Sequence, residues 1–427
     1  MPLPDLIEIC PAQGPIQARI VVPGSKSLTN RALILAALSK GETVLQGALW
    51  SEDTQVMTEC LQELGFLISV QQDPFEPANR QITVQGMGGH VPKGGPAGAP
   101  LELFVGNAGT AARFLAAFLC LGEGDYLLQG VPRMHERPQA SLFQALRTLG
   151  YRIDSPNDRL PAVIRGSGPR PGACSVSAAE SSQFASALLL SGRTGRWQVS
   201  MTDADPEESP YVKMTDELVK AFPGAGGTFV IEPDASSGSY FWAAQPLVNC
   251  SPSGSHRIEV ARWPDSGWQI DAEFPKFLPL PASVSRQRDL GDSIMTAIVL
   301  APFSRIETRF TELGRLRVQE CERVVALRTE LGKCGARIRE EDDTLIVQPG
   351  PLHGAEIDTY QDHRMAMCFS ILGLKVPGMR IKNPGCVKKT FPNFFQKLSS
   401  RAPHGLGVSI RDPREDRILE GKELLPD

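Results

Sequence analysis

The chain contains no run of lysine and arginine, no CxxC pair and no long apolar stretch. With a net charge of −4 at pH 7, neither nucleic acid nor a membrane surface is an expected partner. The nine cysteines are odd in number and scattered, which argues against a disulfide framework or a zinc site. The longest apolar run, Phe114–Leu121, is far shorter than the roughly 20 residues of a transmembrane helix. An anion site in this chain must therefore be built from individually placed cations, and the expected partner is a small anion.

The composition is that of a soluble globular chain of two or more domains. Hydrophobic residues make up 41% of the 427 residues and charged residues 22%. The opening residues, Met1–Asp5, show no basic segment followed by an apolar one, so no targeting signal is expected here. Together with the cysteine usage, this predicts a reduced, cytoplasmic location.

Six segments place small, hydroxyl or acidic residues next to an apolar helical stretch. The first, Pro23–Arg31, carries two cations and three hydroxyls just before Ala32–Leu38. The other five are Gly106–Thr110, Ser181–Phe184, Asp234–Gly238, Gly291–Ser293 and Gln361–Arg364. Taken singly, each is better explained as an N-cap or a tight turn. Together they predict six related α/β units whose helix N-termini converge on one anionic ligand, because such ends attract negative charge.

Alternating strands and helices support this division. Strands are expected at Gln17–Val22 and Thr43–Gln46, and an amphipathic helix at Glu52–Leu64. Further helices are predicted around Ala111–Leu121, Leu142–Leu149, Phe184–Leu190 and Val212–Ala221. The small-residue segment Phe222–Ser237 is a candidate domain boundary or hinge, and the charged tail after Asp412 is expected to be flexible.

Arginines accompany several of these segments. Arg113 lies one helical turn past Gly109, and Pro132–Pro138 brings Arg133 and Arg137 into a loop that its prolines should keep from being mid-helix. The planar guanidinium suits carboxylate and phosphate because it binds two oxygens at once. A solvated surface charge is the alternative for each arginine taken alone.

Nine motifs together resemble the 5-enolpyruvylshikimate-3-phosphate synthase family. They are GSKSLTNRAL, GNAGTAARFLAA, PRMHERP, SSQF, DASSGSYF, LGDSIMT, RVQECER, DHRMAM and KTFPNFF. The resemblance extends from about Ala18 to Leu398. The more distant UDP-N-acetylglucosamine enolpyruvyl transferase shares the architecture but not these motifs.

The resemblance implies an α/β fold, the two-domain enolpyruvyl transferase fold or inverse α/β prism. Each domain would contain three βαβαββ units with helices inside and sheets outside. The first domain would comprise residues 1–22 and 235–427, the second residues 23–234, with the active site in the cleft between them. The family is usually monomeric, and its reaction implies no metal or organic cofactor.

The implied reaction transfers the enolpyruvyl group of phosphoenolpyruvate to the 5-hydroxyl of shikimate 3-phosphate and releases phosphate. Asp292 matches the family residue that accepts the hydroxyl proton of the acceptor. Glu320 matches the residue that delivers and recovers the proton at the methylene carbon, and Lys26 would stabilise the charge that develops on the intermediate. The residues that match the phosphoenolpyruvate site are Lys26, Gly109, Arg133, Gln183, Arg323, Arg364 and Lys389.

The acceptor site matches less completely. Its candidates are Ser27, Arg31, Ser181, Ser182, Gln183, Tyr211, Asp292, Arg315 and Gln319. The family usually has a serine, then any residue, then Pro-Tyr, whereas this chain has Glu208-Ser209-Pro210-Tyr211, so a glutamate replaces that serine. In addition, Arg315 replaces an asparagine of the family and Gln319 replaces a lysine. Arg315 could pair with Glu208 or replace that lysine, and Ser209 could take the place of the missing serine. Each of these side chains could also point outward, away from the acceptor.

Two alternatives follow from these departures. The chain could be a carboxyvinyltransferase for a different alcohol, or a non-catalytic relative that binds a phosphorylated metabolite. Intact Lys26, Asp292, Glu320 and Lys389 weigh against the second alternative.

A separate departure, Phe114 where many family members have proline, predicts altered sensitivity to glyphosate, which competes for the donor pocket.

Overall fold

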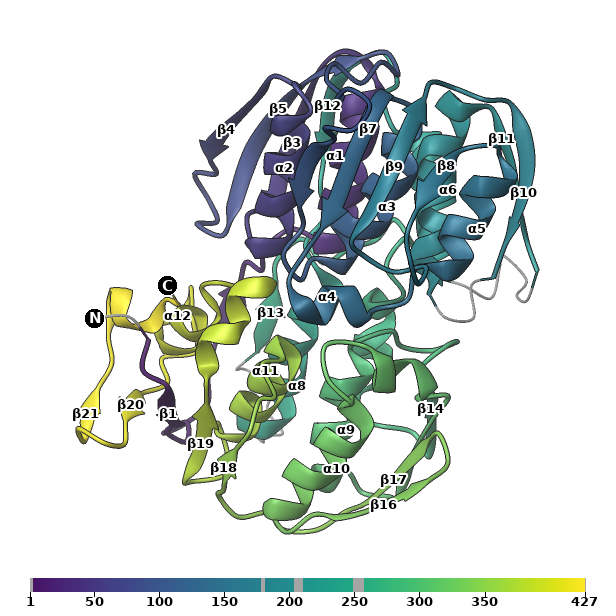
Figure 1. Cartoon of the computed structure of the whole chain (residues 1–427). Coiled ribbons are helices and arrows are strands. Elements are labelled where there is room, and N and C mark those ends of the chain that lie inside the picture. Colours follow the sequence, from purple (N-terminus) through teal and green to yellow (C-terminus); the bar gives the residue numbers. More distant parts are fainter. Residues whose placement is uncertain (1–2, 178–180, 203–209, 249–256, 427) are drawn as a thin grey trace. The chain divides into compact units, whose positions relative to one another are not determined.

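The computed structural model describes residues 3–177, 181–202, 210–248 and 257–426 (Figure 1). Contacts divide the chain into two compact units, which we describe separately. Unit 1 comprises Met1–Pro23 and Pro233–Asp427, and unit 2 comprises Gly24–Glu232. The chain thus passes between units at two points, after Pro23 and after Glu232.

Unit 2 alternates helices with strands along most of its length. Its helices are α1 (Lys26–Leu38), α2 (Glu52–Glu63), α3 (Gly109–Leu119), α4 (Pro132–Glu136), α5 (Ala140–Thr148), α6 (Ser182–Gly195) and α7 (Pro210–Ala221). Its strands are β3 (Lys40–Leu49), β4 (Ile68–Gln72), β5 (Asn79–Met87), β6 (Leu101–Phe104), β7 (Glu123–Gln129), β8 (Arg152–Asp154), β9 (Ala162–Ser167), β10 (Gly172–Val176), β11 (Trp197–Met201) and β12 (Gly227–Val230).

Unit 1 has the same alternation with shorter elements. Its helices are α8 (Ala235–Val248), η2 (Ile270–Phe277), α9 (Ile294–Leu300), η3 (Ala301–Phe303), η4 (Gly314–Val318), α10 (Arg323–Lys333), α11 (His363–Leu372), η5 (Pro384–Lys389), α12 (Phe394–Ser399) and η6 (Gly421–Leu424). Its strands are β1 (Leu6–Ile9), β2 (Ala18–Ile20), β13 (Ile258–Val260), β14 (Ser283–Ser285), β15 (Thr308–Thr311), β16 (Arg337–Glu341), β17 (Thr344–Gln348), β18 (Glu356–Ile357), β19 (Met379–Lys382), β20 (Ile410–Asp412) and β21 (Arg417–Ile418).

One strand-pairing pattern recurs in four sheets. The orders β12-β3-β5-β4 and β6-β7-β9-β8 in unit 2 match β14-β15-β17-β16 and the first four strands of β18-β19-β1-β20-β21 in unit 1. In each, the first pair is parallel and the next two pairs are antiparallel. The smaller sheets β10-β11 and β13-β2 consist of the parallel pair. This recurrence is what repeated units of one design produce, as the sequence predicted.

The sheets enclose helices that are buried on all sides. Every residue of α3, α9 and α11 is buried, a condition that requires an apolar or small residue at almost every position. In unit 2, α1, α3 and α6 pack against one another, and in unit 1, α8, α9 and α11 do so. The predicted α/β architecture with helices inside is therefore confirmed.

All six segments that the sequence placed at helix N-termini lie there. They open or precede α1, α3, α6, α8, α9 and α11. The first helix begins earlier than expected, at Lys26, so Lys26–Arg31 forms its first turns. Within the described ranges, no helix combines the length and apolar character needed to cross a membrane.

Two local expectations were wrong. Pro132–Pro138 is not wholly a loop, because Pro132 opens the short helix α4, for which its missing N–H is harmless. The tail after Asp412 is not frayed: β21 pairs antiparallel with β20, and Leu419 and Leu424 are buried. The interpretation of Glu208 and Ser209 falls outside the described residues.

Candidate active site

In unit 2, Lys26 lies at the N-terminus of α1. Ser25 caps this helix, its hydroxyl accepting a hydrogen bond from the Leu28 amide at 3.4 Å. The Lys26 ammonium is 3.1 Å from the Asp53 carboxylate of α2, and both side chains are largely buried. Gly24 cannot carry a side chain, because a Cβ there would lie 2.0 Å from the Gly47 carbonyl oxygen of β3. Strand β3 therefore fixes the position from which α1 starts.

Arg31 is buried among three helices rather than exposed. Its guanidinium donates to Thr215 Oγ1 of α7 at 2.7 Å and to Ser186 Oγ of α6 at 3.1 Å. A further bond goes to the Ser27 carbonyl at 2.9 Å, and the guanidinium lies 5.1 Å from the Phe114 ring centroid. Burial lowers the pKa of Arg31 to about 10. Arg31 therefore connects α1, α6 and α7 through its hydrogen bonds.

The N-terminus of α3 is surrounded by two guanidinium groups. A Cβ on Gly109 would lie 2.5 Å from Arg113 Nη1 and 2.6 Å from both terminal nitrogens of Arg137. Arg113 donates to the Gly109 and Pro138 carbonyls, and its Nε is buried with no partner among the described residues. Burial, and then the charge of Arg137, lower the pKa of Arg113 well below its usual value. A side chain at position 109 would therefore displace these guanidinium groups from the N-terminus of α3.

Gln183 connects the N-termini of α6 and α3. Ser181 caps α6 by accepting from the Gln183 amide at 3.2 Å, and Gln183 Nε2 donates to Thr110 Oγ1 at 3.2 Å.

Three other predicted acceptor residues of unit 2 also lie in first turns of helices. Ser182 is buried in the first turn of α6, and Ser27 lies half-buried in the first turn of α1. Tyr211, in the first turn of α7, accepts at its carbonyl from Thr215 Oγ1 at 2.8 Å.

Arg133 is the exposed member of the predicted donor site. It forms an ion pair with Glu136 at 2.5 Å on the surface of α4, and both side chains are more than half exposed. Such a pair contributes only about 0–1 kcal/mol, so an anionic ligand could displace Glu136 easily.

In unit 1, Asp292 is surrounded by arginines from three elements. Its Oδ2 is 3.1 Å from Arg364 Nη2, and its Oδ1 is 3.2 Å from Arg286 Nη2 and 3.8 Å from Arg323 Nη1. Burial by itself would raise the pKa of Asp292, but Arg364, Arg323 and Arg286 outweigh it and hold the pKa well below its usual range. These arginines therefore favour the ionised form of Asp292.

Glu320 lies beside Asp292 on the other terminal nitrogen of Arg323. Its Oε2 is 2.9 Å from Arg323 Nη2, and its Oε1 is 3.4 Å from Lys389 Nζ. Gln319 joins the same group: its amide donates to Asp292 Oδ1 at 3.5 Å, and its carbonyl oxygen accepts from Arg323. One buried guanidinium thus holds both predicted proton-transfer carboxylates.

Asp362 holds Arg323 in place. It accepts from Arg323 Nε at 2.6 Å and Nη2 at 3.2 Å, and it caps α11 by accepting from the Arg364 amide at 2.9 Å. Asp362 is fully buried and Arg323 is 1% exposed. Although burial acts to lower the pKa of Arg323, its carboxylate partners raise it, so the guanidinium stays charged.

Two residues of this group were missed by the sequence reasoning. Asp271 of η2 accepts from the Gly291 amide at 2.8 Å and from the Ser293 amide at 3.1 Å, which fixes the backbone on both sides of Asp292. Arg286 reaches Asp292 from the turn after β14. Neither residue belongs to the six segments that the sequence placed at helix N-termini, so no local pattern marked it. Burial, and then the charge of Asp292, raise the pKa of Asp271.

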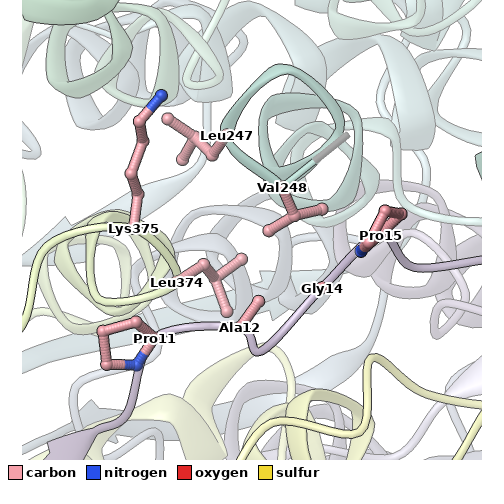
Figure 2. Close-up of a pocket in the computed structure, with 8 residues that line it drawn as sticks. All are labelled: Pro11, Ala12, Gly14, Pro15, Leu247, Val248, Leu374 and Lys375. Atoms are coloured by element: carbon pink, nitrogen blue, oxygen red, sulfur yellow. The ribbon is translucent and has the colours of Figure 1, made fainter. Parts of the chain in front are cut away.

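Of the predicted residues of unit 1, six form one connected cluster: Asp292, Gln319, Glu320, Arg323, Arg364 and Lys389. Arg315, in η4, is half-buried. A surface pocket in the same unit contains none of the predicted site residues. Figure 2 shows that its walls are mainly apolar, with Lys375 the one charged residue.

Buried arginines around paired carboxylates, held at helix N-termini, suit an enzyme that moves protons on an anionic substrate. Known structures with this fold include the EPSP synthase from Acinetobacter baumannii, with a TM-score of 0.70, 21% identity and coverage of 95% of this chain and 100% of that one. The enolpyruvyl transferase NikO from Streptomyces tendae has a TM-score of 0.67 at 15% identity, covering 95% and 98%. The fold is therefore that of the enolpyruvyl transferases.

Sequence comparison gives the family. The model of EPSP synthase (3-phosphoshikimate 1-carboxyvinyltransferase) matches residues 11–249 and 277–398. The 3-phosphoshikimate 1-carboxyvinyltransferase of Pseudomonas syringae pv. syringae is 38% identical, covering 95% of this chain and 98% of that protein. That of Nostoc punctiforme is 35% identical, covering 92% and 98%. The chain belongs to the EPSP synthase family, as the motifs indicated.

Proposed function

We propose that this enzyme transfers the 1-carboxyvinyl group of phosphoenolpyruvate to the 5-hydroxyl of shikimate 3-phosphate. The acceptor oxygen adds to C2 of phosphoenolpyruvate while C3 takes up a proton. The intermediate then loses the proton from C3 and phosphate from C2, which leaves the enol ether. The observation that carries the proposal is the pair of carboxylates, Asp292 and Glu320, on one buried guanidinium.

In this proposal the two carboxylates have separate roles. Asp292 accepts the proton of the acceptor hydroxyl, and Glu320 delivers and recovers the proton at C3. Each needs a fixed position, because proton transfer requires contact at hydrogen-bond distance. Arg323 holds both carboxylates in position. It can do so because two of its three nitrogens, Nε and Nη2, donate to the buried Asp362.

Donor binding would increase the basicity of Asp292. Arg364 contacts Asp292, and Lys389 contacts Glu320. Phosphoenolpyruvate offers phosphate and carboxylate oxygens that compete for the same cations. A carboxylate that loses a cationic neighbour has a higher pKa, so donor binding would make Asp292 a stronger base when it is needed.

Unit 2 would contribute further cations to the same reaction. We propose that Lys26, Arg133 and Gln183 bind phosphoenolpyruvate together with the α3 N-terminus at Gly109, and that Lys26 steadies charge on the intermediate. Ser27, Ser181, Ser182 and Tyr211 are proposed to contact the acceptor. For Arg31, whose guanidinium is bonded within unit 2, a role in holding α6 and α7 around the acceptor fits better than direct contact.

The first test follows phosphate release from phosphoenolpyruvate and shikimate 3-phosphate, with shikimate or no acceptor as controls. Release that depends on the phosphorylated acceptor supports the proposal. Tight phosphoenolpyruvate binding by calorimetry without release would refute this choice of acceptor and direct the search to other alcohols.

The second test is Asp292→Ala. Turnover should fall by a factor of at least about 100, in line with the loss of a general base, while phosphoenolpyruvate still binds. An unchanged rate would refute the role of Asp292. We also propose that the enzyme is a cytoplasmic monomer, and light scattering on the purified protein tests the monomer.

A further inference from the structure

Arg286 is a buried cation whose hydrogen-bonding capacity is largely unused. Its side chain is 6% exposed, and among the described residues Asp292 is the one partner of its guanidinium, at 3.2 Å. The Nε atom is buried and has no hydrogen-bond partner there. An unsatisfied buried donor is costly, so one beside a reactive carboxylate calls for an explanation, and a bound ligand is one that fits this position.

The backbone around Arg286 is held firmly. The Arg286 amide donates to the Thr311 carbonyl at 3.1 Å, and the Ser285 amide donates to Asp289 Oδ2 at 2.7 Å. Ser285 Oγ accepts from the Gln287 and Arg288 amides at 3.2 and 3.0 Å. The turn after β14 therefore fixes the point from which Arg286 reaches Asp292.

The neighbours of Asp292 differ in how many of their hydrogen-bonding groups already have partners. Arg323 is bonded to Asp362, Gln319 and Glu320, so it is fully engaged inside the unit. Gln319 is neutral, and both ends of its amide are bonded. Arg286 contacts Asp292 and has a buried Nε donor with no hydrogen-bond partner in the part of the chain that the structure describes.

We propose that Arg286 belongs to the acceptor site: one terminal nitrogen holds Asp292, and the remaining N–H groups donate to an oxygen adjacent to the reacting hydroxyl. The inference rests on the proposed function, since it takes Asp292 as the group that meets that hydroxyl. In shikimate 3-phosphate the adjacent oxygen is the 4-hydroxyl. Arg286 would then select alcohols with a second oxygen on the neighbouring carbon.

The test compares Arg286→Gln and Arg286→Lys with the matched control Arg288→Gln. Arg288 lies on the same turn, is 77% exposed and is 3.8 Å from Glu312. Arg286→Gln should raise the KM for shikimate 3-phosphate about 10- to 100-fold, the effect of losing a hydrogen bond from a charged donor. The KM for phosphoenolpyruvate should change less than about twofold, and Arg288→Gln should change neither.

A 4-deoxy analogue of shikimate 3-phosphate allows a double-mutant cycle in which one change is made in the enzyme and the other in the acceptor. With this analogue the penalty of Arg286→Gln should largely disappear, because the oxygen that Arg286 binds is absent. Arg286→Lys keeps the charge but loses the planar group, so it should recover part of the acceptor affinity. Thermal unfolding of each variant checks that the fold is retained, and calorimetric titration with shikimate 3-phosphate measures binding without turnover.

The outcomes separate the two proposals. Equal penalties for Arg286→Gln with both acceptors, or an unchanged acceptor KM, would overturn the role of Arg286 while leaving the proposed function intact. A native enzyme that neither binds nor turns over shikimate 3-phosphate would overturn the proposed function, and this inference with it.

Discussion

The ion pair between Asp362 and Arg323 offers a sharp test of how the site is held. Both side chains are almost completely buried, and Asp362 accepts two bonds from the guanidinium, at 2.6 and 3.2 Å. Asp362→Asn keeps the shape and one oxygen that can still cap α11. It removes the charge, and leaves Arg323 facing an amide that can donate as well as accept.

The expected loss of stability is large. Removing one partner of a buried ion pair typically costs about 3–5 kcal/mol, because the other charge stays buried without full compensation. Arg323 retains Glu320 at 2.9 Å, which places the expectation near the lower end. With a urea slope of about 3 kcal/mol per molar for a unit of this size, the unfolding midpoint should fall by about 1 M.

Urea unfolding followed by circular dichroism measures this shift. Asp416→Asn is the matched control: its carboxylate is 85% exposed and pairs with Arg411 at 3.1 Å, so its loss should cost less than about 1 kcal/mol. If Asp362→Asn lowered the midpoint no more than the control does, with an unchanged slope, the reasoning from burial would be refuted.

Three further predictions concern packing, pH and a buried hydrogen bond. Gly24→Ala should destabilise the protein by about 1–3 kcal/mol in urea unfolding, because its Cβ would meet a β3 carbonyl at 2.0 Å, whereas Gly14→Ala, with nothing within 4 Å, should stay within about 0.5 kcal/mol. Because the folded-state pKa of Asp292 is depressed, its contribution to stability is present above its unfolded pKa of about 3.9 and lost as pH falls through the folded value. The difference in unfolding free energy between native protein and Asp292→Asn should thus be constant from about pH 5 to 8 and shrink in acid; a difference that grew in acid would contradict the assignment. Tyr360→Phe removes a 2.7 Å bond to the buried Glu330 carboxylate and should cost about 1.5–3 kcal/mol by calorimetry, and an unaltered Tm would count against that bond.

Local chemistry explains why the helix N-termini could be predicted. A serine, aspartate or glycine before an apolar stretch marks a helix start through contacts within three residues, as at Ser25 and Asp362. The motif around each start also identified Lys26, Gly109 and Arg364 as candidates, and their catalytic and binding roles stay predictions. The tail after Asp412 was mispredicted because its order comes from the pairing of β21 with β20, which its charge pattern does not reveal.

Partners distant in sequence account for what was missed. Arg31 is held by Thr215, 184 positions away, so its burial does not follow from the polar residues around it in sequence. Arg286 and Asp271 lie in a turn and a short 3-10 helix that carry no helix-start pattern.

The repeated α/β design, the helix starts and the family could be predicted without the structure, because they depend on local capping, hydrophobic periodicity and motif order. The tertiary structure decided which charged groups meet, because an ion pair forms only where packing brings its partners together. Asp292 shows this division. Its place before a helix was readable, but its three arginines come from the turn after β14, from α10 and from α11, and only the packing of those elements puts them around one carboxylate.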